Sequence, residues 1–293
     1  HGEVVGVVNT SETTTHELAR MMVGREVLFR VDKKAITPGE TVIEVKNLSA
    51  FDDRGLLALD DISLNIKAGE IVGIAGVQGN GQSELVETLT GLRKVENGEI
   101  VIGGVDYTDS TPREILKVGV AHIPEDRQRR GLVLNFSLKE NVILGLHYYP
   151  EYSNYTVFAN ERVEEFTKLG IKTFEIKVAD LDTPISTMSG GNQQKIILAR
   201  ELLGRNPKLI IAAQPTRGLD VGVIEYVHKI LIQMCGQGLA ILLISTELDE
   251  IRSLADRAFV LFKGKFMAEV DPKTISDEDI SLLMAGESLE GKN

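Results

Sequence analysis

The segment that most constrains the fold is GIAGVQGNGQSELV, residues 73–86, in which an apolar strand leads through a glycine loop into a helix. Its glycines have the spacing of the phosphate-binding motif G-x-x-x-x-G-K-[ST], and this strand–loop–helix context is the one that the motif requires. Gln82 stands at the lysine position, whereas Ser83 keeps the hydroxyl that would bind Mg²⁺. Because charged hydrogen bonds contribute on the order of 1.5–3 kcal/mol, an uncharged glutamine should weaken phosphate binding roughly 10- to 150-fold. On this motif alone, a nucleotide loop and a plain strand–turn–helix remain as alternatives.

The composition narrows the class of protein. The formal net charge of −11 argues against general nucleic-acid binding, which usually relies on a basic face. The single cysteine, Cys235, excludes an internal disulfide framework, and its place on an apolar helix face indicates core packing. No apolar run approaches the roughly 18 residues of a membrane span. The histidines show no ligand spacing and are interpreted as structural or surface residues; the ones considered are His16, His122, His147 and His228.

Strands alternate with helices along most of the chain, which predicts an α/β fold with a mostly parallel sheet and helices on both faces. The apolar patterns predict strands at residues 41–48, 58–66, 70–76, 118–124, 208–213 and 240–245, and a hairpin at 257–270. They predict helices at residues 83–92, 160–170, 191–203, 224–238 and 247–255. Residues 127–158 interrupt this alternation, and we expect them to belong to a helical insertion.

The two ends of the chain resemble each other. Residues 1–25 align without gaps on residues 263–287, and both segments have the pattern of a short strand, a polar linker and an amphipathic helix closed by glycine. Two unrelated strand–helix units would give the same pattern. The preferred interpretation is that residues 1–26 are the tail of a preceding homologous domain, so that this chain is the second half of a tandem protein.

Two further motifs follow the glycine loop in the sequence. TMSGGNQQKIILARELL, residues 187–203, places a serine and two glycines before a helix, which suits either an ordinary cap or an anion site. NPKLIIAAQPTRGLDVG, residues 206–222, comes directly afterwards. The glycine loop, SGGNQQ and PTRGLD form a highly specific combination in this order and spacing.

With these motifs the chain resembles the nucleotide-binding domain of ABC transporters, whose signature motif begins S-G-G. The chain resembles more closely the second of two fused nucleotide-binding domains in bacterial importers of simple sugars and nucleosides. The motifs that carry this closer resemblance are SGGNQQK, the PEDR of HIPEDRQRRGL, and PTRGLDVG. The longer stretch AAQPTRGLDVG is similar to the nucleoside branch of these importers. The resemblance covers about residues 41–285. It implies a P-loop NTPase (RecA-like) fold with an antiparallel β subdomain and a helical subdomain. Residues 27–40 would be a linker and residues 286–293 a C-terminal tail.

The resemblance places the nucleotide site on the glycine loop and the loops near it. The residues that it assigns to nucleotide binding are Gly76, Gly79, Asn80, Gly81, Gln82, Ser83 and Glu84, with Phe51 as the aromatic expected to stack on adenine. Ser83 would also be the Mg²⁺ ligand. The cofactors implied are ATP and Mg²⁺, although binding at this loop is left open by Gln82.

Several family positions carry other residues in this chain. The Mg²⁺-supporting aspartate falls on Ala213, the catalytic glutamate on Gln214, the Q-loop glutamine on Glu125 and the switch histidine on Thr246. A positioned general base contributes typically 10²–10⁴-fold, and phosphoryl transfer depends on positioning and charge neutralisation. We therefore expect this loop to hold a nucleotide at most and not to hydrolyse it.

The signature motif, by contrast, is complete. In the family two domains pair head to tail, and each ATP lies between the glycine loop of one domain and the signature of the other. The resemblance therefore predicts that this chain's signature closes over ATP held by the first domain. The residues assigned to the signature are Ser189, Gly190, Gly191, Asn192 and Gln193, and those assigned to the D-loop are Gly218, Leu219 and Asp220.

The resemblance also implies partners and a location. They are the first nucleotide-binding domain on the same polypeptide, transmembrane permease subunits and, indirectly, an extracytoplasmic substrate-binding protein, on the cytoplasmic side of a bacterial membrane. Residues 132–149 would either contact the membrane subunit or form the core of the helical subdomain. Two other functions stay open: a soluble ABC-type protein acting on ribosomes or DNA, and an autonomous ATPase active as a homodimer. The transported substrate is not encoded in these motifs.

Overall fold

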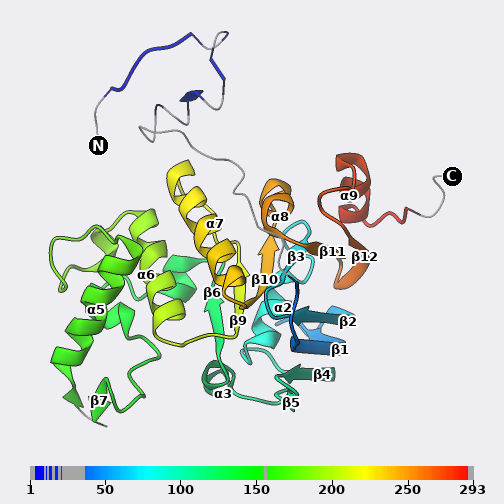
Figure 1. The fold of residues 1–293 in the computed structure, drawn as a ribbon. Coiled ribbons are helices and arrows are strands. Elements are labelled where there is room, and N and C mark those ends of the chain that lie inside the picture. The colour runs from blue at the N-terminus through cyan, green and yellow to red at the C-terminus, as the bar shows by residue number, and fades with distance from the viewer. Residues whose placement is uncertain are drawn as a thin grey trace.

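The computed structural model describes residues 4–9, 11, 13–14, 17–18, 21, 37–154 and 157–289. The predicted tail of a preceding domain and the linker, residues 1–40, lie mostly outside the described residues, as does His16. The described chain forms two larger sheets, a small two-stranded one and a group of helices beside them (Figure 1).

The first sheet is antiparallel and has the strand order β2-β1-β4-β5. Its strands are β1 (Thr41–Phe51), β2 (Leu57–Lys67), β4 (Asn97–Ile102) and β5 (Val105–Asp106). The long pair β1–β2 was predicted from its alternating pattern. In both strands apolar side chains on one face are buried, among them Ile43, Val45, Ile62 and Leu64, because alternate residues of a strand point to the same face.

The second sheet has six strands in the order β12-β11-β3-β10-β9-β6. All neighbours pair in parallel except the hairpin partners β11 and β12. The strands are β3 (Ile71–Ala75), β6 (Val120–Ile123), β9 (Leu209–Ala213), β10 (Ala240–Ser245), β11 (Arg257–Phe262) and β12 (Lys265–Val270). Every one of these strands lies within a predicted segment, so the mostly parallel sheet is confirmed.

Buried side chains of the six-stranded sheet divide between two cores. On β3, Val72 and Ile74 pack with the antiparallel sheet, α2 (Gln82–Leu89) and α3 (Pro112–Lys117). Ile71 and Ala75 join the other core, with α6 (Gly190–Leu203), α7 (Val221–Gly236), α8 (Leu248–Leu254) and α9 (Asp277–Met284). Cys235 is fully buried in this second core, as predicted. The fold is the α/β, P-loop type with an antiparallel β part, which confirms the predicted fold class.

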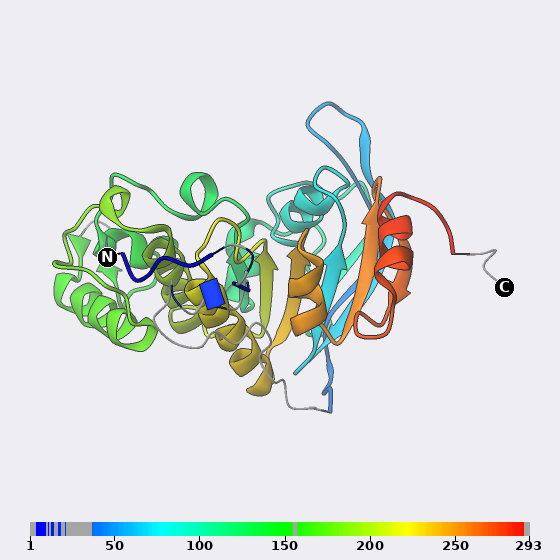
Figure 2. The same ribbon diagram turned by 90° about the horizontal axis from the view of Figure 1, so that it is seen from above.

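Residues 127–158 are helical only in part. They contain the π-helix η1 (Arg127–Gly131), α4 (Leu138–Val142) and the small hairpin β7 (Ser153–Asn154) with β8 (Val157–Phe158). The longer α5 (Asn160–Phe174) follows, and the 3₁₀-helix η2 (Ile185–Thr187) precedes α6. Figure 2 shows this part of the chain to one side of the two sheets.

The apolar residues of segment 132–149 mostly face inward. Those buried are Leu132, Leu138, Val142, Ile143 and Leu146. Phe136 and Tyr148 remain exposed. Most apolar side chains of this segment therefore belong to the core of the helical part. Only a small apolar surface remains there for a partner. No helix in the described part of the chain has both the length and the apolar character needed to cross a membrane.

Candidate functional site

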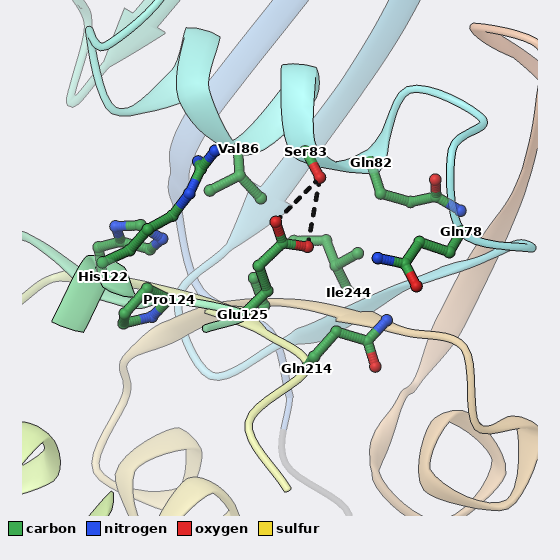
Figure 3. A pocket seen from close by; sticks show the side chains of 11 residues that line it. Gln78, Gln82, Ser83, Val86, His122, Pro124, Glu125, Gln214 and Ile244 are labelled. Atoms are coloured by element: carbon green, nitrogen blue, oxygen red, sulfur yellow. Dashed lines mark hydrogen bonds between the residues drawn. The ribbon is translucent and has the colours of Figure 1, made fainter. Parts of the chain in front are cut away.

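Four parallel strands of the larger sheet end at one edge. In their register, Ala75 of β3 pairs with Ser245 of β10, Ile244 of β10 with Ala213 of β9, and Ala212 of β9 with Ile123 of β6. The segments that follow these strands therefore meet, as is usual for ligand sites in open α/β sheets. They line one cleft, formed by Gln78, Gln82, Ser83, Val86, His122, Pro124, Glu125, Arg130, Ala213, Gln214 and Ile244 (Figure 3).

The glycine loop connects β3 to α2 as predicted. Gly81 has φ +110°, a backbone conformation that residues with a Cβ rarely adopt. Asn80 fastens the loop to the β11–β12 turn, since its Oδ1 accepts a hydrogen bond from the backbone N–H of Lys263 at 2.9 Å and its carbonyl accepts one from Gly264 at 2.9 Å. The first turn of α2 carries no side-chain cap, so the loop retains helix amides that face toward an anion.

Gln82 lines the cleft, but its side-chain amide is bonded within its own loop. Its Nε2 donates to the carbonyl of Val77 at 2.9 Å, and its Oε1 accepts from the backbone N–H of Asn80 at 3.1 Å. The side chain is 7% exposed and lies so close to Gly76 that a Cβ there would be 2.7 Å from Nε2. Figure 3 shows it against its own loop, away from Glu125. One of the loop amides that would hold a phosphate is thus already bonded within the loop.

Ser83 and Glu125 are brought together across the cleft. The Ser83 hydroxyl lies 3.2 Å from both carboxylate oxygens of Glu125 and donates to them (Figure 3). In the family resemblance these are the Mg²⁺ ligand and the Q-loop position. Glu84, half-buried in the first turn of α2, adds a second carboxylate near the loop. Both acids oppose the binding of an anionic phosphate unless a cation lies between them.

The ends of β9 and β10 carry Gln214 and Thr246. Gln214 has φ +47° and donates its backbone N–H to the carbonyl of Ile244 at 2.8 Å. Its side-chain Oε1 accepts hydrogen bonds from the N–H and the hydroxyl of Thr246 at 3.4 and 3.3 Å. Ala213, the residue before it, is buried and has no ligand group. The two positions at which the resemblance expects a base and a switch histidine are therefore bonded to each other.

The positive charge in this cleft is already compensated. Arg130 pairs with Glu87 at 2.5 Å, which raises the pKa of its guanidinium, and Arg93 binds the other oxygen of that carboxylate at 2.6 Å. Burial lowers the pKa of His122 to about 4; Glu201 opposes this shift, whereas Arg200, Arg130 and Arg205 favour it. His122 is therefore neutral near pH 7, and its buried Nε2 has no partner in the described structure.

A second cleft adjoins the first at Gln78 and Gln214 and is bordered by the predicted D-loop. On its wall Glu250 accepts hydrogen bonds at one oxygen from the Thr216 hydroxyl at 2.8 Å and from His228 Nε2 at 3.0 Å. Glu250 is 4% exposed. This cluster joins Thr216, two residues before the D-loop, to His228 of α7 and Glu250 of α8. The structural interpretation of His228 fits this buried position, while Glu250 was not singled out from the sequence.

The signature segment, residues 189–193, begins α6. Ser189 is exposed and its hydroxyl caps the helix, accepting from the N–H and the side-chain amide of Asn192 at 3.4 and 3.1 Å. Gln193 is only 2% exposed, and its side chain donates to the carbonyls of Ile185 and Met188. Ser189 is thus exposed at the start of the helix, whereas Gln193 supports the segment from within.

The remaining predicted residues lie apart from the first cleft or play structural parts. Phe51 ends β1 and is 41% exposed, but it is not among the residues that line either cleft. Gly218 has φ +66°, Leu219 lines the second cleft, and Asp220 caps α7 through Val223 N–H at 3.1 Å. The sequence interpretation missed Gln78, Arg130 and Arg127, although the last two lie in the quoted HIPEDRQRRGL.

The residues of the first cleft fit Mg²⁺-ATP only in part. The loop geometry, the Ser83 hydroxyl and the amides of α2 suit a phosphate. The negative charge of a phosphate would not be neutralised there. Gln82 is uncharged and folded into its own loop, Glu125 is itself an acid, and Ala213 is apolar. Among the described residues that line this cleft, the one carboxylate is Glu125, and it is held by Ser83.

Comparison with known proteins identifies the family of this chain. Residues 59–217, more than half of the chain, match the family described as ABC transporter. The guanosine import ATP-binding protein NupO of Bacillus subtilis (strain 168) is 46% identical over 97% of this chain and 56% of its own length. The glucose import ATP-binding protein TsgD13 of Haloferax volcanii is 42% identical over 97% of this chain and 52% of its own length. The chain therefore spans about half the length of the curated relatives it matches.

A solved structure shares the fold. A dimeric ATP-binding cassette in a post-hydrolysis state, bound to ADP and Pi, superposes with a TM-score of 0.67 at 25% identity, over 80% of this chain and 100% of that one.

Proposed function

The chain belongs to the ABC transporter family, and we propose that it is the second ATP-binding domain of an importer for nucleosides or simple sugars. Its similarity to import ATP-binding proteins for guanosine and glucose supports this assignment. Its span of about half of their length, together with the repeat between its two ends, supports a second homologous domain on the same polypeptide. The importer would also need transmembrane permease subunits, and this chain would then bind them at the cytoplasmic face of the membrane.

We further propose that this chain's own glycine loop does not hydrolyse ATP. The observation that carries this proposal is the Gln82 side chain, which bonds Val77 and Asn80 inside the loop. The lysine charge is missing, Ala213 cannot support a metal ion, and the amide of Gln214 takes up no proton near neutral pH. Hydrolysis at this loop would need all three functions, and such groups act as a unit.

The part of the chain suited to catalysis is then the signature segment. Ser189 is exposed at the start of α6, where the helix amides and dipole favour an anion. In a head-to-tail pair it would lie over the terminal phosphate of ATP held by the first domain. The proposed protein thus has one consensus site, formed by the first domain's loop and this signature, and one degenerate site.

The experiment is the ATPase rate of the complete polypeptide with its membrane subunits. Ser189→Arg places a long cationic side chain at the phosphate position and should abolish hydrolysis. Ser186→Arg is the matched control, because Ser186 is also exposed and lies three residues earlier in the chain; it should leave the rate near wild type. Undiminished ATPase in the Ser189→Arg protein would overturn the proposed role of the signature.

A further inference from the structure

Arg127, the first residue of η1, contacts two of the segments described above. Its Nη1 donates to the carbonyl of Arg217 at 2.7 Å and its Nη2 to the carbonyl of Gly218 at 3.3 Å. The same guanidinium lies over Gly190, where a Cβ would be 2.7 Å from Nη2 and 3.3 Å from Cζ. One side chain therefore touches both the D-loop and the signature segment.

The other arginines of η1 have different environments. Arg129 is 89% exposed and lies 3.8 Å from Asp126, and Arg130 pairs with Glu87. Within residues 37–154 and 157–289, Arg127 has no carboxylate at ion-pair distance, and its buried Nε has no hydrogen-bond partner. Its guanidinium bonds backbone carbonyls instead, which suits a side chain that fixes the position of a loop.

The segment that carries Arg127 is also fixed at its other end. Glu125, two residues earlier, accepts hydrogen bonds from Ser83 at the start of α2. Gln128 donates to Gln193 of the signature helix at 3.1 Å. Residues 125–128 thus connect the glycine loop of this chain with the signature and the D-loop through side chains.

We infer that Arg127 is a positioning residue, which holds the D-loop and the signature segment in the relative geometry that the partner domain's hydrolysis requires. This inference rests on the proposed function, in which the signature completes the consensus site. The close packing on Gly190 gives it a structural basis, because a larger residue at 190 would displace the guanidinium. A misplacement of about 1 Å can cost 10²-fold in rate without weakening substrate binding.

The test measures kcat and KM for ATP in the complete polypeptide with its membrane subunits. Arg127→Met should lower kcat at least about tenfold while KM changes less than about threefold, because positioning acts on the reaction more than on binding. Arg127→Lys should recover part of the loss, since an ammonium can still donate to one of the two carbonyls. Arg129→Met removes the same charge from the same π-helix and should behave as wild type.

A second variant keeps the test decisive if Arg127→Met folds poorly. Gly190→Ala retains the arginine but displaces it, so it should lower kcat, and combining it with Arg127→Met should cost less than the sum of the two losses. Wild-type kcat in Arg127→Met, a rise in KM alone, or additive losses in the double variant would each overturn the inference. Loss of activity in Ser189→Arg together with a normal Arg127→Met would reject the positioning role and leave the proposed function intact. Normal activity in Ser189→Arg would reject the proposed function itself.

Discussion

The side-chain oxygen of Gln214 accepts hydrogen bonds from the N–H and the hydroxyl of Thr246, two residues that follow adjacent parallel strands. Neither side chain gains or loses a proton near neutral pH. At the positions where the family resemblance expects a base and a histidine, this chain has a neutral pair joined by two hydrogen bonds. Substituting Gln214 therefore tests whether this cleft can hydrolyse ATP.

Gln214→Glu on its own should not produce ATP hydrolysis in this chain. The new carboxylate would stand beside Ala213 and Gln82, so it would lack both the metal support and the charge that the reaction needs. Release of labelled phosphate from ATP–Mg²⁺ should be the same for Gln214→Glu and wild type. A rate more than about tenfold above wild type would show that the base is the one missing element. Wild-type turnover that disappears in Gln214→Ala would contradict the proposal directly.

Gln82→Lys should tighten the binding of ATP–Mg²⁺ to the glycine loop. The lysine restores a charged hydrogen bond worth on the order of 1.5–3 kcal/mol, or roughly 10- to 150-fold, and frees the Asn80 N–H that Gln82 now occupies. Titration calorimetry of the two proteins measures the change. Gln237→Lys adds the same charge at an exposed site after α7 and serves as the control. Equal affinities in Gln82→Lys and Gln237→Lys would show that the loop does not bind phosphate.

Stability should fall as the pH drops from 6.5 toward 4. Burial lowers the pKa of His122 from 6.5 to about 4, so between these values the unfolded chain binds a proton that the folded chain does not. The free energy of unfolding then rises with pH across this window, by on the order of 3 kcal/mol in total. Denaturant unfolding at several pH values should show a shallower pH dependence in His122→Asn than in wild type. Identical slopes would mean that His122 is protonated in the folded state.

Thr216→Val should destabilise the fold by about 1–3 kcal/mol, because it removes a hydrogen bond to the buried carboxylate of Glu250. Thr187→Val is the matched control: its hydroxyl donates to the carbonyl of Pro184 at 2.8 Å on the exposed surface, and its loss should cost less than about 0.5 kcal/mol. Urea denaturation compares the two variants. Equal losses would indicate that the Thr216–Glu250 hydrogen bond stabilises the fold no more than an exposed one.

The sequence predicted the elements whose apolar periodicity is long and regular. The strands of the parallel sheet carry continuous apolar patterns and lie within the predicted ranges, and α6 begins one residue before its predicted range. The short elements β4, β5 and α3 were not predicted, because polar residues interrupt their few apolar ones, whereas the equally short β3 and β9 are continuous apolar runs. Residues 127–158 were predicted to be a helical insertion, and they contain the π-helix η1, the short helix α4 and a small hairpin.

The positions of several site residues could be predicted from the sequence, whereas the conformations of their side chains could not. The motifs, and the rule that parallel strands end at one edge, placed Gln82, Glu125 and Gln214 at the first cleft and Thr246 at the adjoining second cleft. The motifs did not predict that the Gln82 side chain folds back into its own loop, because this depends on the distance between that side chain and the Val77 carbonyl. The placement of Arg127 against Gly190 was equally hidden, because it joins segments more than sixty residues apart.

The hydrogen bonds of Gln82 affect the free-energy cost of docking a partner domain on the glycine loop. Ordering a flexible glycine loop loses conformational entropy, and in many sites a bound ligand offsets that loss. Here Val77, Asn80 and Gln82 order the loop with groups of the chain itself. The surface around it is therefore preorganised before a partner domain arrives, and a partner that docks on it has less disorder to remove.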